Sequence, residues 1–417
     1  MDRIILHCDM NNFYASVACK QHPEYAGKPV AVCGAQEDRH GVVLAKNMQA
    51  KACGVQTGEP TVKALQKCPD LIVVMPDFPE YARYSHLARE IYERYTDQVE
   101  PFGMDECWLD VTGSTRLFGS GEEMADRIRR EVREELGLTI SVGVSFNKVF
   151  AKLGSDMRKP DATTCLPRES MQEVIWPLPV EDLLGVGRST KERLHQIGIR
   201  TIGGLACTPE KTLRAALGES GSTLWRYANG LEQEAVMHKD YVADIKTVGR
   251  GITCPADLQN NGECRLVLLA LAQPIGQELR RRDRMATGVA VEIKDNALHT
   301  TSYQCRLTIP TQDSLMLAKV AFAMLCRRYS WHLPVRALTV RAIDLMPAAS
   351  PTQLDLFSGA ATKRRGAVED SCDRIRDRYG DHAINPASLL GQTKMPDDIQ
   401  RSNAIPAFVF VPYEANI

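Results

Sequence analysis

The stretch GMDECWLDV, residues 103–111, decides how the first part of the chain is read. Most of its residues are apolar, as in a buried strand, yet Asp105 and Glu106 stand side by side near its start. Adjacent carboxylates repel each other, and burying them without partners is costly. Successive strand residues point to opposite faces, so the two acids can share a site only near a strand end, which Phe102-Gly103 supplies.

A third acid, Asp9, ends another short apolar run, RIILHCD at 3–9. If the two strands are neighbours, three carboxylates meet at one edge of a sheet. Clustered oxygen ligands suit Mg²⁺, and two such ions can promote an in-line phosphoryl transfer. The residues alone leave a second interpretation open, in which Asp9 caps a helix and the Asp-Glu pair forms a solvated turn.

The composition is that of an ordinary globular protein. The 417 residues suggest two to four domains, with 44% hydrophobic and 25% charged residues. The net charge is −1, so any surface for nucleic acid must be local. Thirteen cysteines without a CxxC pair argue against a zinc site and a disulfide framework, and they fit a reducing cytosol. We find no apolar segment suited to a membrane and expect a cytoplasmic protein.

Strands alternate with helices through residue 165, which indicates an α/β or α+β core. The segment 178–206 differs, because two short helices are expected around GVG at 185–187. Such glycines let a backbone approach a phosphate, as in a helix-hairpin-helix. A plain helical turn is the alternative.

A second mixed unit is expected from 242 to 346, with strands at 287–295 and 335–345 and helices at 262–283 and 313–330. It holds fourteen Lys and Arg against nine Asp and Glu, and its densest basic run is RRRDR at 280–284. Beside a phosphate-binding hairpin, this surplus predicts a DNA contact surface. The alternative for the run is a solvated helix face. After 347, we expect only a helical turn at 374–380.

Six stretches in order carry a resemblance to a known family. They are DMNNFYASV (9–17), GVVLAKNMQAKACGV (41–55), MDECWLDVTG (104–113), SVGVSFNKVFAKLGSDMRKP (141–160), LLGVGRSTKERLHQIGIRTIGGLA (183–206) and KTVGRGIT (246–253). In these the chain resembles the Y-family DNA polymerases, the translesion group that includes bacterial DNA polymerase IV. The resemblance spans roughly residues 1–357.

The resemblance implies an α+β multidomain fold, shaped as a right-hand polymerase. It places palm and fingers at 1–165 (fingers about 12–76), a helix-hairpin-helix thumb at 166–240, a DNA-binding little finger at 242–346 and a tail at 347–417. It also implies low-fidelity, template-directed translesion synthesis without proofreading. The implied partners are primer-template DNA and dNTPs, and we expect a monomer.

Site residues follow from the same resemblance. Asp9, Asp105 and Glu106 would hold two Mg²⁺ ions, with the Met10 carbonyl as an extra ligand. Around the nucleotide, Phe13 and Tyr14 would underlie the sugar, with Tyr14 as the steric gate against a 2′-hydroxyl, while Lys159 and Lys51 would contact the triphosphate. Gly185, Gly187 and Arg250 would contact DNA. Read without the family, Tyr14 is a core aromatic and Lys159 a solvated loop lysine.

The chain departs from many relatives at Ala45, Met48 and Lys51, where those carry a hydroxyl residue, Tyr and Arg. Lys lacks the planar fork of Arg, so bidentate gripping of phosphates is in doubt, and Lys46 could share the task. Asn11 stands where a second carboxylate is common, outside the essential three acids.

Gln353, Leu354, Leu356 and Phe357 resemble the sliding-clamp-binding motif of bacterial polymerases, with Gln forming hydrogen bonds and the apolar groups filling a pocket. The alternative is that they fold back onto the little finger. Two other functions also stay open: a different two-metal enzyme, such as a nuclease or nucleotidyl cyclase, and a catalytically inactive DNA-binding protein.

Overall fold

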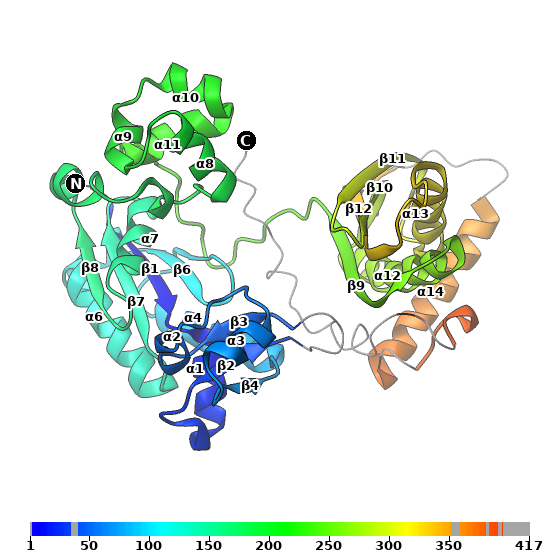
Figure 1. Cartoon of the computed structure of the whole chain (residues 1–417), viewed down its shortest axis with the longest axis horizontal. Coiled ribbons are helices and arrows are strands. Elements are labelled where there is room, and N and C mark those ends of the chain that lie inside the picture. Colours follow the sequence, from blue (N-terminus) through cyan, green and yellow to red (C-terminus); the bar gives the residue numbers. More distant parts are fainter. Residues whose placement is uncertain (1, 35–40, 352–358, 381–382, 391–393, 395–417) are drawn as a thin grey trace. The chain divides into compact units, whose positions relative to one another are not determined.

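The computed structural model describes residues 2–34, 41–351, 359–380, 383–390 and 394. It divides into two compact units, with the boundary between Tyr241 and Val242 (Figure 1). No helix in these ranges is both long and apolar enough to cross a lipid bilayer.

The first unit is built on a five-stranded sheet in the order β5-β6-β1-β7-β8. Its strands are β1 (Ile5–Met10), β5 (Val99–Pro101), β6 (Glu106–Asp110), β7 (Ile140–Ser145) and β8 (Thr163–Leu166). The central strand β1 runs antiparallel to both β6 and β7, with Asp9 directly opposite Glu106. The expected adjacency of the two acid-bearing strands is therefore confirmed. The capping alternative is wrong, because Asp9 lies within a strand and Asn12 holds the N-cap position of α1 (Phe13–Gln21).

The two faces of this sheet have different coverings. Leu6, Cys8 and Leu109 on one face share a core with α4 (Phe78–Tyr92) and α6 (Gly121–Glu131). The other face carries Asp9 and Glu106 and lies against α7 (Lys148–Met157). Gly143 on β7 permits this approach, because a Cβ there would lie 1.9 Å from the Ala151 carbonyl oxygen. The helix that covers the acids therefore sits unusually close to the sheet.

A smaller, three-stranded sheet lies in the same unit. Its strands are β2 (Val30–Cys33), β3 (Val43–Lys46) and β4 (Ile72–Val74), in the order β3-β2-β4. The short helices α2 (Met48–Ala52) and α3 (Thr61–Lys67) accompany it, with Ala50 and Ala64 in its core. This sheet supplies Leu44, Ala45 and Lys46 to the site described below.

Four helices follow the first sheet: α8 (Arg188–Gln196), α9 (Ile202–Cys207), α10 (Glu210–Leu217) and α11 (Glu219–Ala228). They share a core with Phe146 and Phe150 at the start of α7. Only the three-residue turn η6 (Val180–Asp182) precedes GVG, so the first of the two helices expected there is shorter than predicted. Gly185 has φ of +89°, and Gly187 is the N-cap residue of α8.

The second unit contains one antiparallel sheet in the order β11-β10-β12-β9. Its strands are β9 (Val248–Leu258), β10 (Arg284–Asp295), β11 (Thr300–Thr311) and β12 (Val335–Pro347). Helices α12 (Asn261–Arg281) and α13 (Ser314–Arg328) share its core (Figure 1). Sequence reasoning missed β9 and β11 as strands, because polar and glycine residues fill their alternate positions.

Helix α14 (Gly359–Tyr379) is the main surprise of the second unit, since only a turn was expected at 374–380. For comparison, the shortest α-helix of the first unit is the four-residue α5 (Thr115–Phe118). The side chains of α14 that face α12 are charged rather than apolar, which explains why hydrophobic periodicity did not reveal the helix.

Candidate active site

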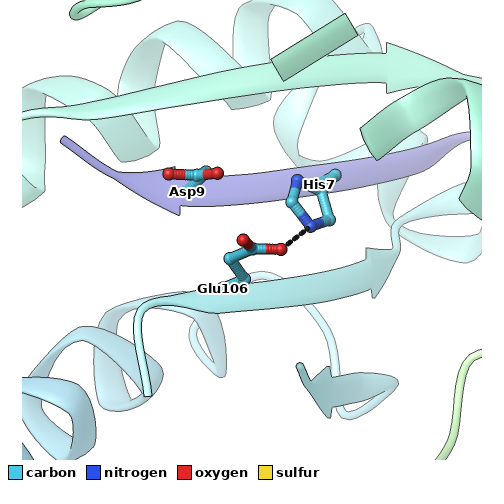
Figure 2. Close-up of side chains that lie close together, drawn as sticks. All are labelled: His7, Asp9 and Glu106. Atoms are coloured by element: carbon cyan, nitrogen blue, oxygen red, sulfur yellow. Dashed lines mark ion pairs between the residues drawn. The ribbon is translucent and has the colours of Figure 1, made fainter. Parts of the chain in front are cut away.

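Three carboxylates converge where β1 ends and β6 begins. Asp9 is 4% exposed, and its partner in the sheet register is Glu106. Together with His7, these two acids offer ligand atoms that all lie within 4.8 Å of one another (Figure 2). Asp105 lies outside that tight group. It borders the same cavity, and its carbonyl oxygen accepts a hydrogen bond from Met10 N at 3.0 Å.

A cavity of about 270 Å³ opens above these acids. Its lining residues are Asp9, Met10, Asn12, Phe13, Tyr14, Leu44, Ala45, Lys46, Thr57, Asp105, Glu106 and Lys159. The structure thus brings together all three expected metal ligands, the extra ligand Met10, both expected sugar-contacting aromatics and Lys159. Lys51 does not belong to the lining. Lys46 does, and its ammonium group donates to Thr57 Oγ1 at 3.0 Å.

Two lysines of the α7 region counter the negative charge. Lys152 Nζ lies 2.5 Å from Glu106 Oε2. Lys159 Nζ lies 2.6 Å from Asp9 Oδ2 and 2.8 Å from Asp156 Oδ1. The solvated-loop interpretation of Lys159 is therefore wrong. Its side chain is held in the acid cluster.

The pKa values of the acids differ in direction. Burial, reinforced by the charge of Glu106, raises the pKa of Asp9 to about 7 and that of Asp105 to about 6. Burial also acts to raise the pKa of Glu106, but the close contact with His7 and the charge of Lys152 outweigh it and lower that pKa to about 2. Ionising all three acids together is therefore unfavourable without added positive charge.

This donor set fits hard divalent cations. Carboxylate and carbonyl oxygens are the ligands that Mg²⁺ prefers, and a cluster that resists full ionisation is stabilised by bound cations. Asp9, Asp105, Glu106 and the Met10 carbonyl could hold such ions.

Tyr14 lies between the core and the cavity. Its ring stacks on Tyr81, with centroids 4.2 Å apart and planes at 16°, and its hydroxyl donates to Met104 Sδ at 3.6 Å. The same ring borders the cavity. Phe13 is 3% exposed and belongs mainly to the core. Tyr14 thus packs against Tyr81 and Met104 while its ring borders the cavity.

Asn11 connects two segments next to the site through hydrogen bonds. Its Nδ2 donates to Ser141 Oγ at 2.9 Å, and its Oδ1 accepts from Asp161 N at 2.8 Å. Both ends of the amide are thereby engaged, and Asn11 is not among the residues that line the cavity. An amide at this position can both donate to Ser141 and accept from Asp161, whereas an ionised carboxylate could only accept.

Sequence reasoning missed three residues next to the acids. His7 is fully buried on the same strand face as Asp9, and Lys152 and Ser155 face it from α7. One signal was available: His7 stands two residues before Asp9, so the strand period places both on one face. The position of Lys152 and Ser155 beside this face depends on how α7 packs on the sheet, which the local sequence does not indicate.

In the second unit, the densest basic run is paired with acids. Acids pair with four arginines of the run 280–284: Arg280 with Glu369 and Asp373, Arg281 with Asp377, Arg282 with Glu278, and Arg284 with Asp244. Most of these partners lie on α14, far away in the sequence. Much of the charge of this run is therefore balanced within the protein, and the DNA contact surface expected from the basic surplus of 242–346 stays a prediction.

A different basic surface lies on the sheet face that points away from the core shared with α12 and α13. Alternation along the strands places Arg306 of β11 and Arg341 of β12 on this face. Gly249 lies opposite Arg341, and a Cβ there would come within 2.6 Å of the Arg341 side chain. The glycine therefore lets the arginine lie across the strand. We call this surface, defined by Arg306, Arg341 and Gly249, the open sheet face.

Other predicted residues lie apart from the first cavity. Arg250 alternates with Val248 and Ile252 on the core side of β9, and its Nη1 donates to Gly249 O at 3.1 Å. It is therefore not on the open sheet face. Gly185 and Gly187 lie at the turn before α8. Gln353, Leu354, Leu356 and Phe357 fall outside the described residues.

Comparison with known proteins is consistent with this geometry. Family models match residues 8–156 ("impB/mucB/samB family"), 181–232 ("DNA polymerase-iota, thumb domain") and 245–356 ("impB/mucB/samB family C-terminal domain"). A "DNA polymerase IV" of Acetivibrio thermocellus is 47% identical over 94% of this chain and 98% of its own length. "DNA polymerase IV 1" of Bacillus subtilis is 34% identical over 93% of each. A solved "Y-family DNA polymerase chimera" has a TM-score of 0.73 at 24% identity, covering 82% of this chain and 99% of its own.

Proposed function

Because this chain belongs to the Y family of DNA polymerases, as a protein of the DNA polymerase IV type, we propose that Asp9, Asp105 and Glu106 are its catalytic carboxylates. The protein is a DNA-directed DNA polymerase for translesion synthesis, which extends primer-template DNA with dNTPs and does so without proofreading. One observation carries the assignment of the site. The antiparallel register sets Asp9 opposite Glu106 in a cavity that also holds Asp105, Tyr14 and Lys159.

The three acids and the Met10 carbonyl would hold two Mg²⁺ ions. When bound, these ions activate the primer hydroxyl and stabilise the charge that develops on the transferred phosphoryl group and on the leaving pyrophosphate. Asp9 and Asp105 would bind the ions most readily once deprotonated, whereas Glu106 is already charged because Lys152 and His7 stabilise its anion.

The remaining residues of the cavity would position the nucleotide. Lys159 is held by Asp9, and cations on Asp9 would release its ammonium group toward the triphosphate. Lys46 lines the cavity and would contact phosphates together with Lys51. The Tyr14 ring, fixed by Tyr81, would occupy the space that a 2′-hydroxyl needs, with Phe13 supporting it.

The finer organisation is also part of the proposal. We assign palm and fingers to 1–165 (fingers about 12–76), the thumb to 166–240, the little finger to 242–346 and a C-terminal region to 347–417, within which α14 packs on α12 through ion pairs. Phosphate contacts would come from Gly185 and Gly187 at the thumb turn and from the open sheet face of the little finger. Arg250 would assist only from the edge of β9.

The proposal also includes a protein partner, the oligomeric state and the location of the enzyme. Residues 353–357 would bind the sliding clamp, and the enzyme would work as a monomer in the cytoplasm.

Primer extension tests the site. Asp105→Ala and Glu106→Ala should abolish Mg²⁺-dependent incorporation yet bind primer-template DNA as the wild type does, because metal ligands act on the transition state rather than on the DNA backbone. Glu90→Gln, an exposed acid of α4, is the matched control and should extend normally. Near wild-type extension by either site variant would show the assignment to be wrong, and a shortened primer would point to a nuclease.

A further inference from the structure

We propose that His7 is a positioning residue that holds Glu106 in the orientation needed for metal binding, an inference that rests on the proposed function. The imidazole is 0% exposed, and its Nε2 lies 3.2 Å from Glu106 Oε2 (Figure 2). Lys152 Nζ approaches the same oxygen. Two nitrogen groups therefore converge on Oε2, while the other oxygen of Glu106 lies on the side of Asp9 (Figure 2).

The other ring nitrogen is held from α7. His7 Nδ1 lies 2.8 Å from Ser155 Oγ, and the Ser155 hydroxyl donates to the Lys152 carbonyl oxygen at 2.7 Å. A buried ring avoids the cost of charge by staying neutral. The neutral ring protonated on Nε2 directs its N–H toward the carboxylate, and the single Ser155 hydroxyl proton then turns from the Lys152 carbonyl oxygen to Nδ1.

Packing fixes the ring in its plane. Trp108, in register with His7 on the neighbouring strand, meets it edge-on with centroids 5.3 Å apart. Trp108 is itself held by a 3.0 Å hydrogen bond from its Nε1 to Lys148 O. On the other neighbouring strand, Gly143 is in register with His7, and a Cβ there would lie 2.5 Å from Ser155 N. Ser155 can reach the ring only because that position lacks a side chain.

The contact between His7 and Glu106 is not yet a well-aligned hydrogen bond, since Nε2 lacks a partner of good geometry. Contacts of this kind shorten when substrate and metal draw a catalytic group into its working position. With Oε2 held by His7 and Lys152, the second carboxylate oxygen is directed toward the ions. Losing such a supporting partner typically weakens metal binding or activity by about 10- to 100-fold.

Direct coordination is the competing role, because His7, Asp9 and Glu106 could surround an ion themselves. The geometry favours positioning, since Nε2 faces a carboxylate oxygen that Lys152 also approaches. The two roles differ in one observable: a coordinating imidazole places nitrogen in direct contact with the metal.

The test compares four variants of the full chain bound to primer-template DNA and a non-hydrolysable dNTP. His7→Phe keeps the ring and removes both nitrogens. His7→Gln restores one donor. Ser155→Ala removes only the partner of Nδ1, and His86→Phe, an exposed histidine of α4, is the matched control. Mn²⁺ serves as the probe, with its affinity measured by electron paramagnetic resonance and its nitrogen coupling by pulsed methods. DNA affinity and thermal unfolding are measured in parallel.

His7→Phe should bind Mn²⁺ at least about tenfold more weakly with unchanged DNA affinity, with partial recovery in His7→Gln and a smaller loss in Ser155→Ala. Wild-type Mn²⁺ affinity in His7→Phe overturns the proposal. So does a nitrogen coupling in the wild type that vanishes in His7→Phe, since that would show direct coordination. If His7→Phe does not fold, unchanged affinity in Ser155→Ala overturns it instead. A wild type that binds Mn²⁺ but cannot extend primers refutes the proposed function, not this inference.

Discussion

Replacing Arg306 and Arg341 together by alanine should weaken DNA binding and make it less sensitive to salt. The two arginines lie on the open sheet face, on the two strands that flank β10. Among the ion pairs of the described residues, none involves either of them, whereas four arginines of the run 280–284 are paired with acids. The two guanidinium groups are therefore available for phosphates.

The magnitude follows from counterion release. Each phosphate contact on duplex DNA contributes about −0.9 to the slope of log affinity against log salt concentration, so losing two should reduce the slope by about 1.8. Between about 50 and 200 mM salt, the affinity of the wild type should fall about 12-fold more than that of the double variant.

Fluorescence anisotropy with a labelled primer-template duplex over a salt series measures the slope. Arg281→Ala is the matched control, because its guanidinium pairs with Asp377 on α14 and should not contribute. Circular dichroism checks that both variants are folded. An unchanged slope in the double variant, or an equal drop in Arg281→Ala, would mean that DNA binds to a different surface.

Three further changes test other parts of the molecule. Tyr14→Ala should lower the preference for dNTPs over rNTPs by at least about tenfold, because the ring no longer excludes the 2′-hydroxyl; single-nucleotide incorporation measures the ratio, and an unchanged ratio would make Tyr14 a packing residue only. Gly143→Ala should destabilise the first unit by roughly 1–3 kcal/mol or more in denaturant unfolding, because its Cβ would overlap the Ala151 carbonyl oxygen, and wild-type stability would contradict the close approach of α7. Leu356→Ala with Phe357→Ala should leave synthesis on a bare primer unchanged but remove stimulation by loaded clamp, and full stimulation would show that this peptide is not the anchor.

The acid site could be read from the sequence because its signal is local. Each acid-bearing strand is a short apolar run with a carboxylate at its end, and the strand period limits where those carboxylates can point. The six ordered motifs then supplied the family and the roles that spacing alone could not assign. The structure confirmed the adjacency of β1 and β6.

The parts that were missed depend on contacts between distant segments. Lys152 and Ser155 reach the acids only because α7 lies close to the sheet at Gly143, and no local pattern reports that distance. Polar β11 and charged α14 lack the apolar periodicity on which element prediction relies. The strand period could have placed His7 on the same face as Asp9, but it could not have predicted what a single buried histidine does there.

The density of basic residues along the sequence is a poor guide to where DNA binds, because ion pairs within the folded protein decide how much positive charge stays unpaired. Around the acid site the acids outnumber the cations beside them, and burial together with the charge of Glu106 raises the pKa values of Asp9 and Asp105, which suits a site that binds metal ions. In the second unit the cations have acidic partners, since Glu369 and Asp377 of α14 pair with Arg280 and Arg281. The densest basic run thus pairs with α14, and we expect Arg306 and Arg341, which form no ion pair among the described residues, to contact the phosphates. A protein of net charge −1 can bind DNA through local groups of positive charge, because the net charge does not report how charge is distributed over the surface.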